Sequence, residues 1–403
     1  MWEREVCPQR YVVILRGTTV YAPPVSAMTH DKKDASVVTV KIQVPDPGHY
    51  QLFAWPDFDV CPHYWRANMT YSFNRGQVFG TPLPIQVTGK PSQRDSFGSC
   101  QLDSTGIAPV GRWISRTALQ PAYRKSKWMD TYPRDQEHIY QPFTCKRHHY
   151  DARFAIDNAK SVSQMLFLGD SVIRGSFCSQ IWPQLSDSGM ADGQCTYINS
   201  AAKYHVTPKD TVYQTPDGRD VRLSFRFMYA DPEASLKKLE RTKSVVGTPS
   251  HVVANAGLWV APRGIRYYRN AVKAFLIKLS AMYPDAMVIW RTTMDVAPMI
   301  QCFSDKSMTR GIMADQRAVS LEVIGELRSQ GYTNLHVVDA YAITEGRPDT
   351  GNDGRHWVAE VPRKVPDQWA KSRPHINHAE WAALDAVWDL ILRHDETVTA
   401  HGE

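Results

Sequence analysis

Short apolar runs alternate with segments of helical periodicity in the second half of the chain. The runs are Met165–Leu168, His251–Ala254, Ala286–Trp290 and Leu335–Val338. Each has the length of a strand and is apolar throughout, which is typical of parallel strands that are covered on both faces. The pattern predicts an α/β fold with a parallel sheet flanked by helices.

Three segments carry apolar residues at the spacing of a helix. They cover residues 265–282, 310–330 and 378–392. The apolar stripes are Val272, Phe275, Leu279 and Met282 in the first, Ala318, Leu321, Ile324 and Leu327 in the second, and Trp381, Leu384, Trp388 and Ile391 in the third. We expect these stripes to pack against the sheet.

The first 95 residues follow a different pattern, in which strand-like segments are separated by turns and show no helical period. The expected strands are Val37–Val44, His49–Trp55, Tyr71–Phe73 and Leu83–Val87. Strands at this spacing predict a β-sandwich accessory domain over residues 1–95.

Residues 96–160 appear irregular in pattern and are rich in aromatic and basic side chains, so we interpret them as a connecting segment. Trp113 and Phe143 either pin this segment onto a core or stack on a sugar ring. The remaining residues, 161–403, form the predicted catalytic domain.

Composition narrows the class of protein. The chain has 403 residues, of which 43% are hydrophobic and 22% charged, as in globular proteins. No apolar run approaches the roughly 20 residues of a membrane-spanning helix. The start of the chain has no hydrophobic leader, so either the protein is not targeted or a leader or membrane anchor is missing. The net charge of +6 is spread over small basic groups, and nucleic acid is not an expected partner.

Seven cysteines are scattered along the chain without any metal-ligand spacing. They suit either disulfides in an oxidising compartment or buried thiols in the cytosol. Asn68–Thr70 is a glycosylation sequon. Together these features favour the secretory pathway, in the Golgi lumen or outside the cell. We expect no metal site, because the histidine groups His148 with His149 and His375 with His378 have no carboxylate or cysteine beside them.

Ser171 is the candidate nucleophile. It follows the first apolar run in the sequence Gly169-Asp-Ser171 and precedes a segment of helical spacing, which places it at a strand-to-helix junction. The first N–H groups and the dipole of a helix stabilise negative charge at such a junction. The alternative is that Ser171 or Asp170 only caps the helix.

Asp353 and His356 are three residues apart and can project from the same side of a helical turn. Asp353 would then orient the ring of His356, and His356 would take the proton of Ser171. Alternatively, Asp353 caps a turn and His356 packs against Trp357.

Attack by Ser171 on an ester creates an oxyanion, which needs donors that are already in place. The side-chain amide of Asn255 and the backbone N–H of Ser171 are the candidates, and Arg174 can direct a positive charge to the same place. Asn255 can instead form a turn with Gly257, and Arg174 can instead form a surface salt bridge.

These motifs together resemble a known group. Gly169-Asp-Ser-Val-Ile-Arg174 with Asp353-Gly-Arg-His-Trp357 is similar to the SGNH-like PC-esterase superfamily. That superfamily includes the plant trichome-birefringence-like O-acetyltransferases, the fungal capsule and sialate O-acetyltransferases, and the neurexophilin and PC-esterase domain proteins. The resemblance spans roughly residues 98–395. Asn255-Ala-Gly-Leu-Trp259 departs from the plant pattern, whose asparagine block continues with His-Trp-Trp.

The resemblance implies roles for individual residues. Ser171 would be the nucleophile, His356 the base and Asp353 its partner, while Arg174 and Asn255 would help to stabilise the oxyanion. Gly169 and Gly257 would shape the same site. The N-terminal strands would form an immunoglobulin-like sandwich.

The resulting hypothesis is a carbohydrate O-acetyltransferase that works through an acyl-serine, with no tightly bound cofactor and acetyl-CoA as the candidate acetyl donor. A poly- or oligosaccharide would be the acceptor. Aromatic residues near the site, Trp113, Trp259 and Trp357, favour the transferase because they can stack on a sugar. The alternatives are a carbohydrate acetyl esterase and a glycan- or protein-binding relative with a vestigial site.

Overall fold

The four predicted apolar runs all form strands of one sheet. They are β9 (Gln164–Gly169), β12 (His251–Ala254), β13 (Met287–Arg291) and β14 (Leu335–Val338), and every residue in them is buried. The computed structural model of the chain describes residues 11–23, 27–34, 37–44, 46–56, 78, 80–89, 100, 111–118, 138–145, 147, 149–185, 209–228, 231–241, 243–296, 310–347 and 378–402.

A hairpin that was not predicted from the sequence extends this sheet. It consists of β10 (Lys209–Gln214) and β11 (Asp220–Phe227). The strand order is β10-β11-β9-β12-β13-β14, in which β10 is antiparallel to β11 and all other neighbours are parallel. The predicted parallel sheet is therefore confirmed.

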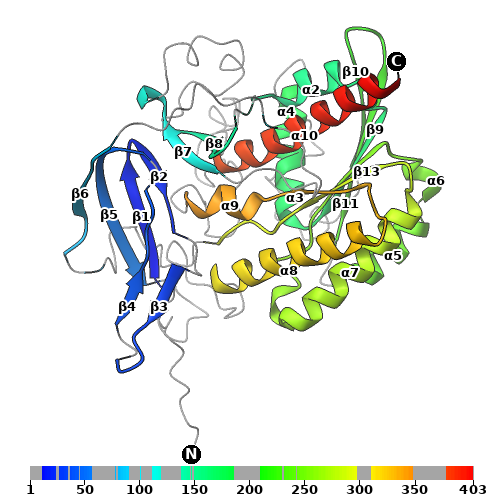
Figure 1. Ribbon diagram of the computed structural model, residues 1–403. Helices are drawn as coiled ribbons and strands as arrows, with labels where there is room; N and C mark the ends of the chain where they lie inside the picture. Colours follow the sequence, from blue (N-terminus) through cyan, green and yellow to red (C-terminus); the bar gives the residue numbers. More distant parts are fainter. Residues whose placement is uncertain are drawn as a thin grey trace, which may run out of the picture.

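Helices cover both faces of the sheet, so that the C-terminal part is a three-layer α/β/α structure (Figure 1). One face carries α2 (Ala152–Asn158), α3 (Ser171–Ser176), the π-helix Phe177–Ile181, α4 (Trp182–Leu185) and α10 (His378–Gly402). The other carries α5 (Pro232–Arg241), α6 (Lys243–Val246), α7 (Ile265–Met282) and α8 (Arg310–Ser329).

The three predicted helices are confirmed as α7, α8 and α10. The bounds of α7 agree with the prediction, whereas α10 continues ten residues beyond the predicted end at Leu392. Among the helices of the described ranges, none has the length and hydropathy needed for a membrane span.

The N-terminal strands form a second sheet, which is antiparallel and six-stranded, with the order β6-β5-β1-β2-β7-β8. Its strands are β1 (Tyr11–Gly17), β2 (Thr19–Tyr21), β5 (Gly48–Pro56), β6 (Leu83–Val87), β7 (Gly111–Ser115) and β8 (His138–Pro142). A separate ribbon pairs β3 (Met28–His30) with β4 (Val38–Val40). The immunoglobulin-like sandwich stays a prediction.

Two predictions about the first 160 residues need correction. The expected strand Val37–Val44 is regular only at Val38–Val40. The segment 96–160, interpreted as irregular, contains β7, β8 and α2, and its two strands pair into the N-terminal sheet. The expected strand Tyr71–Phe73 and the sequon Asn68–Thr70 lie outside the described residues.

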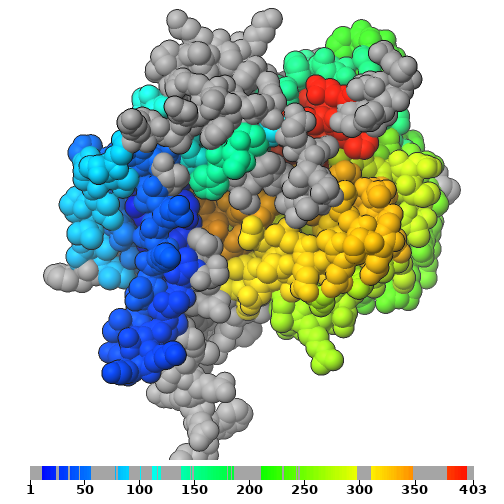
Figure 2. Space-filling model, in the orientation of Figure 1, coloured from blue at the N-terminus to red at the C-terminus, as the bar shows by residue number. Residues whose placement is uncertain are grey.

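The N-terminal sheet packs against α9 (Ala340–Glu345), the short helix that follows β14. Trp113 on β7 is 1% exposed, and its indole N–H donates to the carbonyl of Ile343 at 2.8 Å. The guanidinium of Arg347 lies over the same indole, 5.1 Å from the ring centroid. Figure 2 shows the N-terminal strands (blue) lying against the yellow-to-orange surface formed by α8 and α9. Two roles were predicted for Trp113, and the structure supports packing onto a core. A buried ring cannot stack on a sugar.

A buried polar cluster joins the N-terminal sheet to α10. Asp385 accepts from the guanidinium of Arg147 at 2.6 Å, from Nδ1–H of His149 at 2.6 Å and from the backbone N–H of Tyr150 at 2.7 Å. The side-chain amide of Gln141 on β8 donates to Nε2 of His149 at 2.6 Å. Burial opposes ionisation of Asp385, but Arg147 and His149 keep its pKa below the ordinary value. Asp385 is therefore a charged centre in the core.

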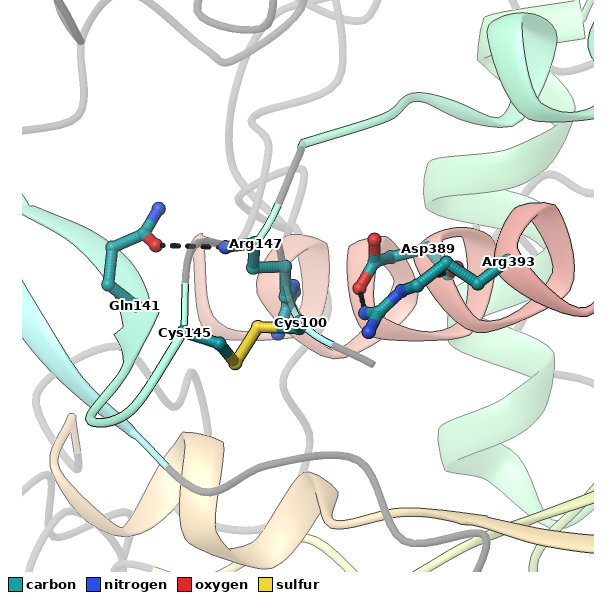
Figure 3. The surroundings of a disulfide bond; sticks show 6 residues. All are labelled: Cys100, Gln141, Cys145, Arg147, Asp389 and Arg393. Atoms are coloured by element: carbon teal, nitrogen blue, oxygen red, sulfur yellow. Dashed lines mark hydrogen bonds and ion pairs between the residues drawn. A yellow bond between two sulfur atoms is a disulfide. The ribbon is translucent and has the colours of Figure 1, made fainter. Parts of the chain in front are cut away.

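Cys145, two residues before Arg147 of this cluster, forms a disulfide with Cys100. Figure 3 draws the disulfide with Arg147, whose backbone N–H donates to Gln141, and with the Asp389 and Arg393 ion pair on α10. Cys178 in the π-helix is also disulfide-bonded. The described cysteines thus follow the disulfide alternative rather than the buried-thiol one.

We expect Asp385→Asn to destabilise the protein by about 3 kcal/mol or more, because Arg147 then stays buried without its counter-charge. Urea unfolding measures the change. Glu233→Gln, which removes a carboxylate from an exposed ion pair with Lys278, is the control and should change stability far less. Equal effects of the two substitutions would contradict a special role for the buried cluster.

Candidate functional site

The strand order defines where a ligand site is expected in the parallel sheet. From β9 the chain moves to one side to form β11 and then returns to the other side to form β12. Such a reversal is a topological switch point, and ligands bind in the crevice at the carboxyl ends of the two strands that flank it. The flanking strands are β9 and β12, which are followed by Ser171 and Asn255. Two predicted site residues therefore stand at the switch point.

Ser171 is the first residue of α3, and Asp170 is the residue that caps the helix. The backbone of Asp170 is extended, and its carboxylate accepts from the N–H of Val172 at 2.9 Å. Asp170 is 2% exposed, whereas Ser171 is partly accessible. Asp170 therefore supplies the cap, and Ser171 sits at the strand-to-helix junction that the sequence predicted.

Gly169 allows α3 to lie close to the end of β9. A Cβ atom at this position would overlap the side chain of Ile173 and would lie 3.2 Å from the carbonyl oxygen of Asn255. The backbone N–H of Asn255 donates to the carbonyl of Leu168 at 3.0 Å. Only a glycine permits both close approaches, so Gly169 brings the turn that bears Ser171 next to Asn255.

Asn255 is 3% exposed, and its side-chain amide donates to the backbone carbonyl of Arg291 at 2.8 Å. An amide nitrogen carries two N–H groups, and this bond uses one of them. The bond holds the amide at the carboxyl end of β12, beside β13.

Gly257 fills a tight position in the loop after β12. A Cβ atom there would overlap the side chain of Thr293, which is 2% exposed. The carbonyl of Gly257 accepts from the N–H groups of Val260 at 3.0 Å and Ala261 at 2.9 Å, and from the side chain of Gln316 at 3.3 Å. Gly257 thus shapes a fixed loop. The turn that its carbonyl closes is with Val260 and Ala261, whereas the side chain of Asn255 bonds the carbonyl of Arg291.

Arg174 lies one turn into α3 and is 8% exposed. The alternative of a surface salt bridge is therefore wrong, because the side chain is buried. Charges interact more strongly in the protein interior than in water, so a buried guanidinium acts on nearby groups more strongly than one on the surface.

A buried ion pair beneath the site was not predicted from the sequence. The guanidinium of Arg291, at the end of β13, contacts both carboxylate oxygens of Glu380 on α10 at 2.8 and 2.5 Å. The same guanidinium donates to the hydroxyl of Ser176 on α3 at 2.7 Å, and Ser176 also bonds Glu380. Glu380 stands in the first turn of α10, where an acidic residue is expected on helix-dipole grounds alone, so its sequence position gave no further signal.

A second unpredicted acid, Glu345, ends α9 near the carboxyl end of β14. It accepts from the hydroxyl of Tyr341 at 3.2 Å, while Arg310 donates to its backbone carbonyl at 3.0 Å and to the carboxylate of Asp295 at 2.7 Å. Burial raises the pKa of Glu345 to about 8, and the nearby Asp295 adds to the shift although Arg310 opposes it. Burial also raises the pKa of Asp295. Arg310 thus bonds the carboxylate of Asp295 and acts on the carboxyl group of Glu345 only through its charge.

The other predicted site residues cannot be placed in this geometry. Asp353, His356 and Trp357 lie outside the described residues, so the complete triad stays a prediction. Of the aromatic residues proposed to meet a sugar, Trp113 is buried and Trp259 is 50% exposed. Within the described ranges, no group of histidine, cysteine and acidic side chains is arranged to hold a metal ion.

Some proteins of known structure are similar to this chain. No family model matches the chain, and no curated protein matches its sequence. An acetylxylan esterase from Geobacillus stearothermophilus is similar with 15% identity and a TM-score of 0.32, covering 58% of this chain and 96% of the esterase. A lipase/acylhydrolase from Enterococcus faecalis has 16% identity and a TM-score of 0.31, covering 50% and 90% of the two chains.

A third neighbour is the salicylyl-acyltransferase SsfX3 from a tetracycline biosynthetic pathway. It has 16% identity and a TM-score of 0.30, with 66% of this chain and 58% of that chain covered. TM-scores this low do not establish a shared fold. The strand order and the residues of this chain define the site.

We expect Gly257→Ala to destabilise the protein by about 1 to 3 kcal/mol, because the added methyl group must displace the buried side chain of Thr293. Gly325→Ala is the matched control. No atom lies within 4 Å of the position that its Cβ would occupy, and Gly325 is inside α8, so alanine should stabilise the protein there by about 0.5 to 1 kcal/mol. Urea unfolding of both variants checks the prediction, which fails if the two changes have the same sign.

We expect the free energy of unfolding to fall as the pH rises from about 4.5 to about 8, in part because of Glu345. Over this range the folded protein keeps a proton on Glu345 that the unfolded chain releases, so raising the pH favours unfolding. Glu345→Gln is neutral at every pH and should flatten this dependence. Urea unfolding at several pH values measures it, and Glu240→Gln on the surface of α5 controls for the loss of a carboxylate. An unchanged slope in Glu345→Gln would contradict the assignment.

Proposed function

We propose that this chain is an SGNH-like enzyme that moves an acetyl group to or from a carbohydrate hydroxyl through an acyl-Ser171 intermediate. One observation carries the proposal. Ser171 begins a helix at the carboxyl end of β9, at the switch point of the parallel sheet, and Asn255 stands at the end of the neighbouring strand. A serine at such a junction is favourably placed for attack on an ester.

The proposed first step forms the acyl-serine. Oγ of Ser171 attacks the carbonyl carbon of the acetyl donor while His356, oriented by Asp353, takes the hydroxyl proton. The tetrahedral intermediate then collapses, the bond to the leaving group breaks, and His356 returns the proton to that group. In the second step a sugar hydroxyl or water attacks the acyl-serine, with His356 again transferring the proton, and Ser171 is regenerated.

The oxyanion of each tetrahedral intermediate needs donors that are already oriented. The proposed donors are the backbone N–H of Ser171 and the amide of Asn255, whose orientation is fixed by the bond to the carbonyl of Arg291. The buried charge of Arg174, one turn into the same helix, would add to the stabilisation. Gly169 and Gly257 would act by allowing the close approaches that keep these groups together.

The direction of the reaction depends on which nucleophile reaches the acyl-serine. We favour transfer to a poly- or oligosaccharide, with acetyl-CoA as the candidate donor and with neither a metal nor a tightly bound cofactor. Burial of Trp113 removes one of the aromatic residues that favoured the transferase, and exposed Trp259 supports it. Release of acetate into water is the alternative.

We also propose that the protein works in the secretory pathway, in the Golgi lumen or outside the cell, with a membrane anchor as a further candidate feature. The support is the Cys100 and Cys145 disulfide together with the disulfide-bonded Cys178. Disulfides persist in oxidising compartments and are rare in the cytosol.

We expect Ser171→Ala to lower the rate of acetyl transfer or release by about a thousandfold or more, because the nucleophile is lost. Intact-protein mass spectrometry after mixing with acetyl-CoA, or with an aryl acetate, should show one acetyl group on wild-type Ser171 and none on the variant. Ser163→Ala, an exposed serine just before β9, is the control and should behave as wild type.

Assays with and without an acceptor oligosaccharide separate the two directions. A transferase needs the acceptor for turnover, whereas a hydrolase releases acetate in water alone. A Ser171→Ala variant with wild-type activity would overturn the proposal, and so would acetylation at another residue that accounts for turnover.

A further inference from the structure

Trp259 is a large aromatic side chain that stays exposed between two buried neighbours. It is 50% exposed, whereas Leu258 and Val260 are 3% and 1% exposed. The loop that holds it is fixed by the bonds to the carbonyl of Gly257 described above. The indole of Trp259 is therefore exposed on a loop whose backbone is held in place.

The ring of Trp259 lies across the end of β9. Its partner is Phe227, at a centroid distance of 6.4 Å and an interplanar angle of 82°. Phe227 is the last residue of β11 and pairs in register with Gly169 of β9. Strands β11 and β12 flank β9 on opposite sides. Trp259 follows β12 and contacts Phe227 at the end of β11, so its ring crosses the carboxyl end of β9. From that end the chain turns toward Ser171.

Phe227 is itself held by further aromatic rings. It contacts Phe225 edge to face at 6.5 Å, and Phe225 stacks on Phe177 of the π-helix at 6.0 Å. All three phenylalanines are buried. The exposed indole thus stands on a rigid aromatic support, so a ligand that binds it meets a surface whose ordering cost has already been met in folding.

We propose that Trp259 is the platform on which a pyranose ring of the carbohydrate substrate stacks next to Ser171, an inference that rests on the proposed function. The C–H groups on one face of a pyranose carry partial positive charge, and they match the electron-rich face of an indole. The sugar hydroxyls at the ring edge would remain free to point toward the acyl-serine. Trp259 is a binding residue in this proposal and takes no part in the chemistry.

The kinetic test compares Trp259→Ala with Trp259→Phe on two substrates. The first is a xylo-oligosaccharide, offered as the acceptor with acetyl-CoA and, in acetylated form, as the ester to be cleaved. The second is ethyl acetate, which has no ring. We expect Trp259→Ala to raise KM for the oligosaccharide about tenfold with little change in kcat, and to leave kcat/KM for ethyl acetate unchanged. Trp259→Phe should recover most of the lost affinity, because it restores an aromatic face.

Phe154→Ala is the matched control, since Phe154 is an aromatic residue with 43% exposure on α2. It should leave both substrates unaffected. Thermal unfolding should show that Trp259→Ala stays fully folded at the assay temperature, so that a change in KM reports on binding. Equal loss on both substrates, or no loss on the oligosaccharide, would overturn the platform.

A binding measurement separates this inference from the proposed function. Calorimetric titration of Ser171→Ala with a panel of neutral and acidic oligosaccharides requires no turnover. Binding that Trp259→Ala abolishes in this background supports the platform even if no ester is ever cleaved, in which case the catalytic proposal alone fails. Binding that does not depend on Trp259, or the absence of binding across the panel, overturns the platform and leaves the acyl-serine proposal to its own test.

Discussion

The architecture depends on Arg291, a buried arginine at the end of a central strand. Its guanidinium binds Glu380 of α10 and Ser176 of α3, and its backbone carbonyl accepts from the amide of Asn255. A buried ion pair of this kind adds little net stability over an apolar core, but it fixes geometry, because a charge without its partner is very costly in the interior. Arg291 therefore sets the positions of α3, α10 and the side chain of Asn255 relative to β13.

The consequence for the site is that its parts cannot shift independently. The helix that begins at Ser171 is held at its far end by Ser176 and at its start by the close contact between Gly169 and Ile173. Asn255 is tied to β9 through Leu168 and to β13 through Arg291. Catalysis of acyl transfer requires donors that need no reorganisation during the reaction, and such a network is a physical means of providing them.

The sequence predicted the elements whose signal lies in neighbouring residues. The apolar runs gave the buried parallel strands, the stripes gave α7, α8 and α10, and the Gly169-Asp-Ser171 turn gave the strand-to-helix junction. The hairpin β10 and β11 was missed although Val221, Leu223, Phe225 and Phe227 alternate with polar residues, because only uniformly apolar runs were interpreted as strands of this sheet. Strands β7 and β8 were interpreted as irregular, because β7 pairs with β2, about ninety residues earlier in the sequence, and β8 pairs with β7, so that only the pairing reveals them. The Arg291 and Glu380 pair was invisible for the same reason.

Helix α10 connects these observations, because two buried charge clusters hold it at successive turns. Glu380 joins it to the parallel sheet, and Asp385 joins it, through Arg147 and His149, to the chain that leaves the N-terminal sheet. The N-terminal sheet is therefore coupled, through α10 and the ion pair of Arg291 with Glu380, to the strand end at which the amide of Asn255 is held.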